Sequence, residues 1–216
     1  MKRIASFGCG VDSVAALIMN HDYDEIIFAD TLDERPETYA YLEYFEKKLG
    51  IKITRVASTK GSLYDWHYQA NSQPSKYNHW CSQKFKVAPI RKYLRKKYGK
   101  KEKFEMYIFI DYSEAHRMRP NDVKYITNMY PLVDAKLNRD DLKQLIVDEG
   151  YLLPIKSGCY CCPFTTVSGW QDLRAKHPDL FEKTVQMEKN SNTKTKLISL
   201  RGHESQTLIE CGCFNG

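Results

Sequence analysis

The sequence has no apolar run near the length of about 20 residues that a bilayer-spanning helix requires, so we expect no membrane-spanning segment. The residues that follow Met1 lack the apolar core of an export signal, and we therefore expect a cytoplasmic protein. No internal repeat or low-complexity tract is present, which excludes a repeat architecture. The first glycine-rich turn lacks the lysine of a Walker A motif, which argues against a P-loop NTPase.

What remains is a chain of 216 residues whose composition, 42% hydrophobic and 28% charged, is typical of a globular protein. Apolar runs with strand and helix spacing alternate along it, which predicts a doubly wound parallel α/β sheet of Rossmann-like type. The expected strands are Lys2–Phe7, Glu25–Ala29, Lys52–Val56 and Phe104–Ile110. The expected helices are Asp12–Asn20, Pro36–Leu49, Val87–Tyr98, Arg139–Glu149 and Gly169–Lys189. We expect a nucleotide-binding domain over residues 1–135 and a helical, cysteine-rich extension over 136–216, in one compact unit.

Seven cysteines are present, an odd number that points to free thiols, a metal or cluster site, or redox chemistry. Cys159 and Cys162 form a Cys-x-x-Cys loop with the chelate spacing of one zinc ion or one edge of an iron–sulfur cluster. Cys161 lies between them and is expected to point elsewhere. Burial as small apolar residues and a redox disulfide are the alternatives.

The net charge of +6 is unevenly distributed. The segment Lys84–Lys103 contains ten lysines or arginines and a single acid, so the rest of the chain is slightly acidic. This pattern fits either a solvated helix face or an anion site for nucleotide phosphates and a nucleic-acid backbone. Tyr93 and Tyr98 could stack on bases there, or could simply pack against the core.

The segment Ser6–Ser13 places a small-residue turn between a strand and a helix. Glycines let the backbone approach a ligand, and the amides at a helix N-terminus favour an anion. Asp12 is placed to cap the helix or to hold Mg²⁺ indirectly. An ordinary strand-to-helix connection would look similar, so the turn alone is weak support for a nucleotide site.

The whole string resembles the Ser-Gly-Gly-x-Asp-Ser loop of the PP-loop ATP pyrophosphatase superfamily, and four further blocks resemble motifs of its PAPS reductase family. They follow in the family order as Asp30–Tyr39, Trp80–Ile90, Ser113–Arg117 and Gly158–Pro163. The resemblance implies an enzyme that binds ATP, or another adenine nucleotide, with Mg²⁺. It assigns nucleotide binding to Ser6, Phe7, Gly8, Gly10, Asp12, Ser13, Asp30, Thr31, Lys84, Lys86, Glu114 and Arg117.

In adenylyl-sulfate reductases the matching cysteines hold a [4Fe-4S] cluster, so the resemblance implies Cys81, Cys159 and Cys162 as ligands, with Zn²⁺ as the less favoured alternative. Trp80 replaces one family cysteine. The fourth ligand could be Cys211 or Cys213, or be absent. The tail segment Glu210–Phe214 also resembles the family's Glu-Cys-Gly-Leu-His tail, which would make Cys211 a nucleophile.

Three functions follow. The first is ATP-dependent sulfur transfer to a nucleic acid (tRNA or DNA) through an adenylated intermediate, with Asp12, Cys211 and Cys213 as catalytic residues. The second is a sulfonucleotide reductase that releases sulfite, but Asp111 and Phe109 stand where reductases carry Arg and Gly. The third is a non-catalytic nucleotide-binding or redox-sensing subunit. Expected partners include a cysteine desulfurase or a thioredoxin-type reductant as sulfur donor or reductant, and a second copy of the chain.

Overall fold

The computed structural model describes residues 1–77 and 80–193. Residues 78–79 and 194–216 lie outside the described part of the chain, and with them the predicted roles of Cys211 and Cys213. Five parallel strands form one sheet in the order β3-β2-β1-β4-β5. Their bounds are β1 Lys2–Phe7, β2 Glu25–Asp30, β3 Thr54–Ala57, β4 Phe104–Ile108 and β5 Ile126–Met129. The predicted α/β class and parallel sheet are confirmed.

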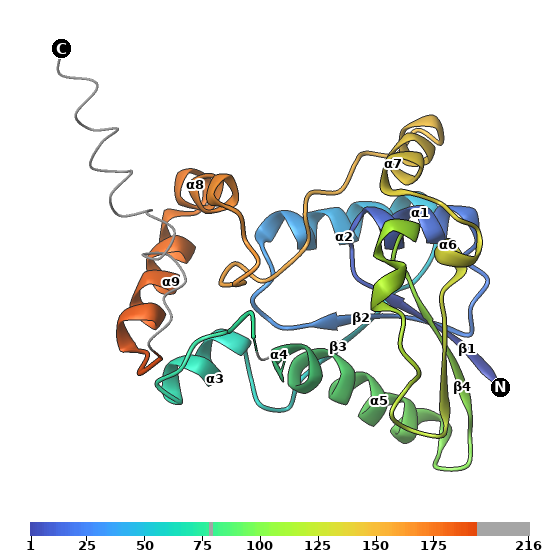
Figure 1. The fold of residues 1–216 in the computed structure, drawn as a ribbon, viewed down its shortest axis with the longest axis horizontal. Helices are drawn as coiled ribbons and strands as arrows, with labels where there is room; N and C mark the ends of the chain where they lie inside the picture. Colours follow the sequence, from blue (N-terminus) through green and yellow to red (C-terminus); the bar gives the residue numbers. More distant parts are fainter. Residues whose placement is uncertain (78–79, 194–216) are drawn as a thin grey trace.

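Helices cover both faces of the sheet (Figure 1). One face packs Phe7, Phe45 and Leu142 in a core under three helices, and the other packs Ile4, Leu94 and Phe104 under one. The first three are α1 Val11–Met19, α2 Pro36–Leu49 and α7 Arg139–Asp148, and the fourth is α5 Ala88–Tyr98. Because both faces are covered, the four residues in the middle of β2, Ile26–Ala29, are all apolar and buried, as is typical of a central parallel strand.

The helix α5 agrees with the predicted Val87–Tyr98 to within one residue, but helical structure that the sequence does not predict precedes it. A short helix α4 (Trp80–Ser82) and a π-helical segment, Gln83–Val87, lead directly into it. A π-helical turn offsets side chains from the usual α-helical spacing, which explains why periodicity alone misses the start. The consequence is that Cys81 sits on the same continuous helical segment as the basic residues that follow it.

The predicted helix Gly169–Lys189 is wrong as a single element. It is divided into α8 (Val167–Lys176) and α9 (Pro178–Asn190), with His177 in a non-helical conformation between them. Proline disfavours a helical conformation in the residue before it, which accounts for the break. Three small helical elements and one strand were not predicted: α3 Leu63–Gln69, the 3₁₀-helix Tyr112–Arg117, α6 Pro131–Asp134 and β5.

The helices α3, α8 and α9 lie together beyond the sheet (Figure 1) and share a third core with the cysteine-rich loop. Arg35 at the start of α2 binds Asp172 of α8, and Glu37 binds His177. These contacts attach the helical extension to the sheet domain at the carboxyl end of β2. None of the described helices is long and apolar enough to cross a membrane.

Candidate functional site

The turn after β1 forms the first wall of the site. The chain passes through Gly8, Cys9 and Gly10 before α1 begins, and the hydroxyl of Ser13 accepts the Gly10 amide at 3.1 Å. A Cβ on Gly10 would lie 3.3 Å from the Ser157 hydroxyl oxygen, so this position suits glycine because two loops approach closely there. The ring of Phe7 stacks on Phe45 in the core, which leaves only the Phe7 backbone for a nucleotide.

The side chain of Cys9 anchors this turn to the core. It adopts a left-handed backbone conformation with φ of 57°, and its buried Sγ donates to the Thr38 carbonyl oxygen at 3.6 Å. Burial, with a smaller contribution from Glu34, raises the pKa of the thiol to about 12. Because a thiol in this state has almost no thiolate at neutral pH, Cys9 is a packing residue of the turn rather than a nucleophile.

Three carboxylates gather beside the turn, at the carboxyl ends of the adjacent strands β1 and β4. The ligand oxygens of Asp12, Asp111 and Glu114 lie within 4.8 Å of one another. Burial raises the pKa of Asp12; Arg139, 3.3 Å away, opposes this, while Asp111 adds to it. Clustered carboxylate oxygens are the donor set that Mg²⁺ prefers, so the residues fit that ion. Arg117 pairs with Glu114 at the rim of the cluster.

The loop after β2 lies at the carboxyl end of the strand next to β1. The Asp30 carboxylate accepts the Leu32 amide at 2.7 Å and the Tyr39 hydroxyl at 2.8 Å, which holds the loop in shape. The buried Thr31 hydroxyl donates to Glu34 at 3.1 Å and lies 3.1 Å from the Cys159 sulfur. Asp30 and Thr31 therefore support this loop through contacts that the sequence did not predict.

Three cysteines come together on the far side of this loop and share one cation. Lys86 lies 3.5 Å from the buried Glu34 carboxylate. Burial lowers the pKa of Lys86, but Glu34 and Cys159 outweigh it, so the pKa lies above its ordinary value. Burial raises the pKa of each thiol, and the positive charge of Lys86 opposes the shift in all three: Cys81, Cys159 and Cys162. The site thus pairs three soft donors with a charge that favours their anionic form.

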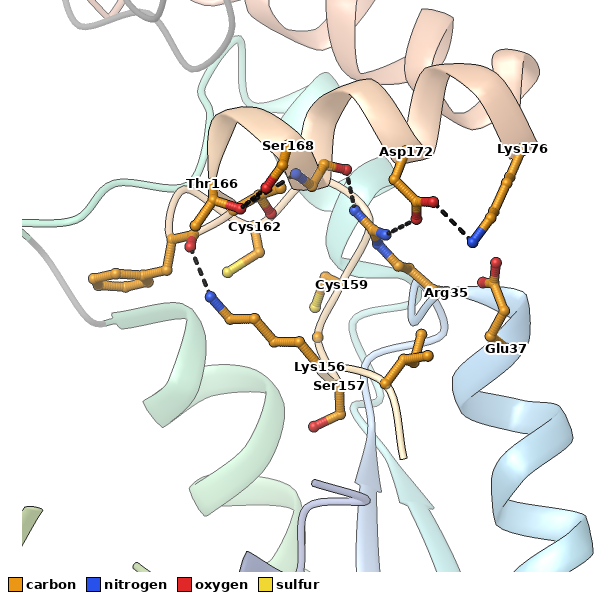
Figure 2. A pocket seen from close by; sticks show the side chains of 15 residues that line it. Arg35, Glu37, Lys156, Ser157, Cys159, Cys162, Thr166, Ser168, Asp172 and Lys176 are labelled. Carbon is orange, nitrogen blue, oxygen red and sulfur yellow. Dashed lines mark hydrogen bonds and ion pairs between the residues drawn. The ribbon is translucent and has the colours of Figure 1, made fainter. Parts of the chain in front are cut away.

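A pocket of about 370 Å³ opens beside these cysteines. Figure 2 shows Cys159 and Cys162 on its wall, with Lys156 and Arg35 on either side. Arg35 is held by the Gly169 carbonyl oxygen at 2.7 Å and by Asp172 at 3.2 Å, so its position is fixed. The Cys159–Cys162 pair therefore lines a cavity with a fixed cation, Arg35, on its wall.

The arrangement of the three thiols differs from the ligand spacing that a single metal ion requires. Within residues 1–77 and 80–193, the acidic trio is the only set of three such donors found within 4.8 Å, and no cysteine trio meets that spacing. A tetrahedral zinc ion with Zn–S bonds of about 2.3 Å would bring its sulfur ligands to about 3.8 Å. Soft thiolate donors of this kind are the ligands of iron–sulfur clusters as well as of zinc, so the three cysteines fit either group by donor type.

The structure therefore gathers the predicted residues into two neighbouring sets. One set surrounds the turn after β1, and the other surrounds the Cys159–Cys162 pair, with the β2 loop between them. Glu34, which contacts the second set, was not predicted, since a lone acid in a loop carries no signal in the sequence. Cys161 is fully buried in the third core with Trp170 and Leu173, so its role is to pack in that core.

Lys84 belongs to neither set. Its ammonium lies over the rings of Trp66 and Trp80, at 4.6 and 4.8 Å from their centroids, and it lines a separate basic groove. The hydroxyls of Tyr93 and Tyr98 both bind Glu25, and both rings pack against the core of this face, although Tyr93 also lines the basic groove. His67 is buried and His177 binds Glu37.

Comparisons with known proteins agree with this architecture. The sequence profile of the phosphoadenosine phosphosulfate reductase domain matches residues 2–116, which span the sheet through β4 and include all three residues of the acidic trio. The crystal structure of a phosphoadenylyl-sulfate reductase from Candida auris, in complex with phosphate, superposes with a TM-score of 0.52. It is 13% identical in sequence and covers 71% of this chain and 75% of its own, a likeness of fold.

Two uncharacterized proteins of Methanocaldococcus jannaschii are also similar. One is 27% identical over 199 residues, covering 83% of this chain and 46% of the relative. The other is 24% identical over 200 residues, covering 83% of this chain and 40% of the relative. The chain thus spans less than half the length of these relatives.

Proposed function

Because the chain belongs to the phosphoadenosine phosphosulfate reductase domain family, we propose that it uses the PP-loop type of site for ATP-dependent sulfur transfer to a nucleic acid. The acceptor would be a carbonyl oxygen of a base or a comparable group, activated as its adenylate. The two sets of residues described above supply the two halves of this reaction: nucleotide activation at the β1 turn, and sulfur delivery at the cysteines.

The observation that carries this proposal is the acidic trio beside the phosphate-binding turn. A sulfated nucleotide would bring several negative charges against Asp12, Asp111 and Glu114, and no cation of its own. ATP arrives with Mg²⁺, which neutralises the carboxylates and bridges them to the phosphates. The trio therefore supports Mg·ATP over adenylyl sulfate as the nucleotide.

The activation step would use the backbone more than side chains. The amides of Gly8 to Gly10 and the N-terminus of α1 would bind the pyrophosphate end of ATP. The acceptor oxygen attacks the α-phosphorus as the bond to the β-phosphate oxygen breaks and pyrophosphate leaves. Asp12, Asp111 and Glu114 would hold the Mg²⁺ ion that offsets the charge of the leaving group.

The transfer step would take place at the pocket beside Cys159 and Cys162. A hydrosulfide-level sulfur forms a bond to the activated carbon while the carbon–oxygen bond breaks and AMP leaves, without net oxidation. If the sulfur arrives instead as a persulfide on Cys211 or Cys213, two electrons must come from a thioredoxin-type reductant. An iron–sulfur cluster on Cys81, Cys159 and Cys162 would supply a site for sulfide, and Lys86 would favour the anionic thiolates.

The test is anaerobic purification with iron and sulfide analysis, followed by binding of ATP and adenylyl sulfate in parallel. We expect Mg²⁺-dependent ATP binding and release of AMP and pyrophosphate only when a nucleic acid and a sulfide source are both present. Tight adenylyl-sulfate binding with release of sulfite would overturn the proposal in favour of the reductase. Binding of ATP with no turnover on any tRNA or DNA would favour the non-catalytic subunit.

A further inference from the structure

The basic residues of α5 divide into two groups with different partners. Arg91 binds Asn121 at 2.8 Å and forms an ion pair with Asp122. The Arg95 guanidinium lies 3.4 Å from the centroid of the Tyr125 ring and donates to three backbone carbonyl oxygens. Lys97 pairs with the buried carboxylate of Glu25. These three cations hold the helix against the sheet and its loops, so their positive charges already have partners within the protein.

A second group faces a groove. Lysines from the loop after β3 and from the segment around α5 line a cavity of about 250 Å³. They are Lys60, Lys84, Lys92 and Lys96. Each is exposed, and within the part of the chain that the structure describes none of them forms an ion pair with a carboxylate.

The spacing of this second group gives the groove a direction. Lys92 and Lys96 are four residues apart on α5, so their side chains lie on one face of the helix about 6 Å apart. Lys84, in the π-helical segment that leads into α5, extends the row toward Cys81. From Lys84 to Lys96 the row covers about 12 residues, or roughly 18 Å at 1.5 Å per residue. The row ends three residues after Cys81, beside the rings of Trp66 and Trp80.

We propose that this groove binds the phosphodiester backbone of the acceptor nucleic acid, an inference that rests on the proposed sulfur transfer. The lysine row would lead the strand along α5 toward the cysteine site, with Lys60 on the opposite wall. A span of about 18 Å corresponds to about five phosphates of one strand in a duplex. Ser58 and Thr59 line the same groove and add polar donors to the lysines.

An acidic protein partner fits this surface less well. Protein interfaces are centred on large apolar or aromatic anchors. In the described part of the chain, none of the large hydrophobic side chains that are exposed lines the groove. Its apolar lining comes from small or buried residues such as Ala57, Ala88 and Pro89 and from the half-buried ring of Tyr93, whose hydroxyl is held by Glu25. The sequence offers an anion site over the whole basic segment as one of two alternatives, and the proposal narrows that site to the lysines that line the groove.

The experiment compares two triple variants with the same loss of charge. The groove variant carries Lys60→Gln, Lys92→Gln and Lys96→Gln, and leaves Lys84 in place because it contacts the tryptophans beside Cys81. The control carries Lys100→Gln, Lys101→Gln and Lys103→Gln, three exposed side chains outside the groove. Binding of a fluorescein-labelled RNA of about 20 nucleotides, and of its DNA counterpart, is followed by anisotropy between about 50 and 200 mM salt.

We expect the groove variant to bind about 10-fold or more weakly at low salt and to lose about two units of salt slope, since each phosphate contact contributes about 0.7 to 0.9 units. The control should change by less than about 2-fold. Equal loss in both variants would overturn the proposal, because it would show a response to net charge alone. Equal binding of poly-glutamate through the same lysines would also overturn it, in favour of an acidic protein.

The outcome separates this inference from the proposed function. ATP binding without acceptor is measured in the same groove variant, which should retain it because the β1 turn is unchanged. If the groove variant binds nucleic acid normally and the parent protein transfers sulfur, the groove proposal alone fails. If it loses nucleic-acid binding while the parent protein transfers no sulfur to any acceptor, the groove stands and the proposed function fails.

Discussion

The sulfur of Cys159 lies 3.1 Å from the hydroxyl oxygen of Thr31, although the two residues are 128 positions apart in the sequence. An antiparallel bridge between Glu34 and Cys159 runs alongside this contact. The loop after β2 therefore forms one unit with the cysteine loop. A nucleotide bound at the carboxyl ends of the strands would be adjacent to the thiols, which brings the two halves of the proposed reaction within one site.

The first prediction concerns the three grouped thiols. Single replacements Cys81→Ser, Cys159→Ser and Cys162→Ser should each lower the iron content of anaerobically purified protein at least several-fold, since each removes a soft ligand. Cys161→Ser is the matched control in the same loop. Its side chain points into the third core, so it should keep iron while losing about 1 kcal/mol of stability. Loss of iron only in the control would contradict the assignment, and so would stoichiometric zinc in the parent protein.

The second prediction concerns the acidic trio. Asp111→Asn removes one carboxylate while keeping the shape and the acceptor oxygen that binds the Ser113 amide at 2.8 Å. We expect the Mg²⁺ concentration needed for half-maximal ATP binding to rise about 10-fold, because a charged ligand is lost. Asp140→Asn, an exposed side chain on α7 that pairs with Lys143, should leave the Mg²⁺ requirement unchanged. Identical Mg²⁺ curves for all three proteins would show that the trio holds no metal.

The sheet and the turn after β1 could be predicted from the sequence because their signals are local. The strand Lys2–Phe7 and the helix that follows are encoded in neighbouring residues by period and turn chemistry. β5 was missed because Ile126–Met129 is four residues long and includes Thr127 and Asn128, too short a run for a periodicity. The division at His177 depended on a single proline, which the apolar spacing on either side outweighed.

The site was predictable in its cysteines but not in its electrostatics. Cys159 and Cys162 carry a spacing signal, whereas the Glu34–Lys86 pair joins residues 52 positions apart and has no counterpart in local pattern. The place of Cys161 between the pair predicts that it points elsewhere, but the core around Trp170 that receives it has no signal in the local sequence. The same holds for the basic helix, where only three-dimensional contacts separate the structural Arg91 and Arg95 from the groove lysines.

The third prediction concerns Cys9. Burial raises the pKa of this thiol to about 12, so at pH 8 only about one molecule in 10⁴ carries the thiolate that alkylating reagents require. We expect mass spectrometry after brief iodoacetamide treatment to find Cys9 unmodified in the folded protein and fully modified after denaturation. Modification of folded Cys9 as fast as a free cysteine would show that the turn opens, and would contradict the packing role given to Cys9.

The fourth prediction is a pH dependence of stability through His67. Its side chain is fully buried, and its Nδ1 lies 3.0 Å from the Ser72 hydroxyl oxygen. Burial, with a smaller contribution from the charge of Lys84, lowers the pKa of His67 to about 4. The unfolded chain has an ordinary histidine pKa of about 6.5, so between these values the unfolded state binds a proton that the folded state excludes.

The sign of the effect follows from that difference. The contribution of neutral His67 is fully present above pH 6.5 and is lost as the pH falls toward about 4, to a total of about 3 kcal/mol. His67→Asn keeps a polar group near Ser72 but cannot be protonated in this range. Urea unfolding of both proteins at pH 7 and pH 5 should therefore show a smaller loss of stability in the variant, by about 2 kcal/mol. Parallel losses in the two proteins would mean that His67 is protonated in the folded state, and that the packing of Trp66 and Trp80 against its ring tolerates a charge.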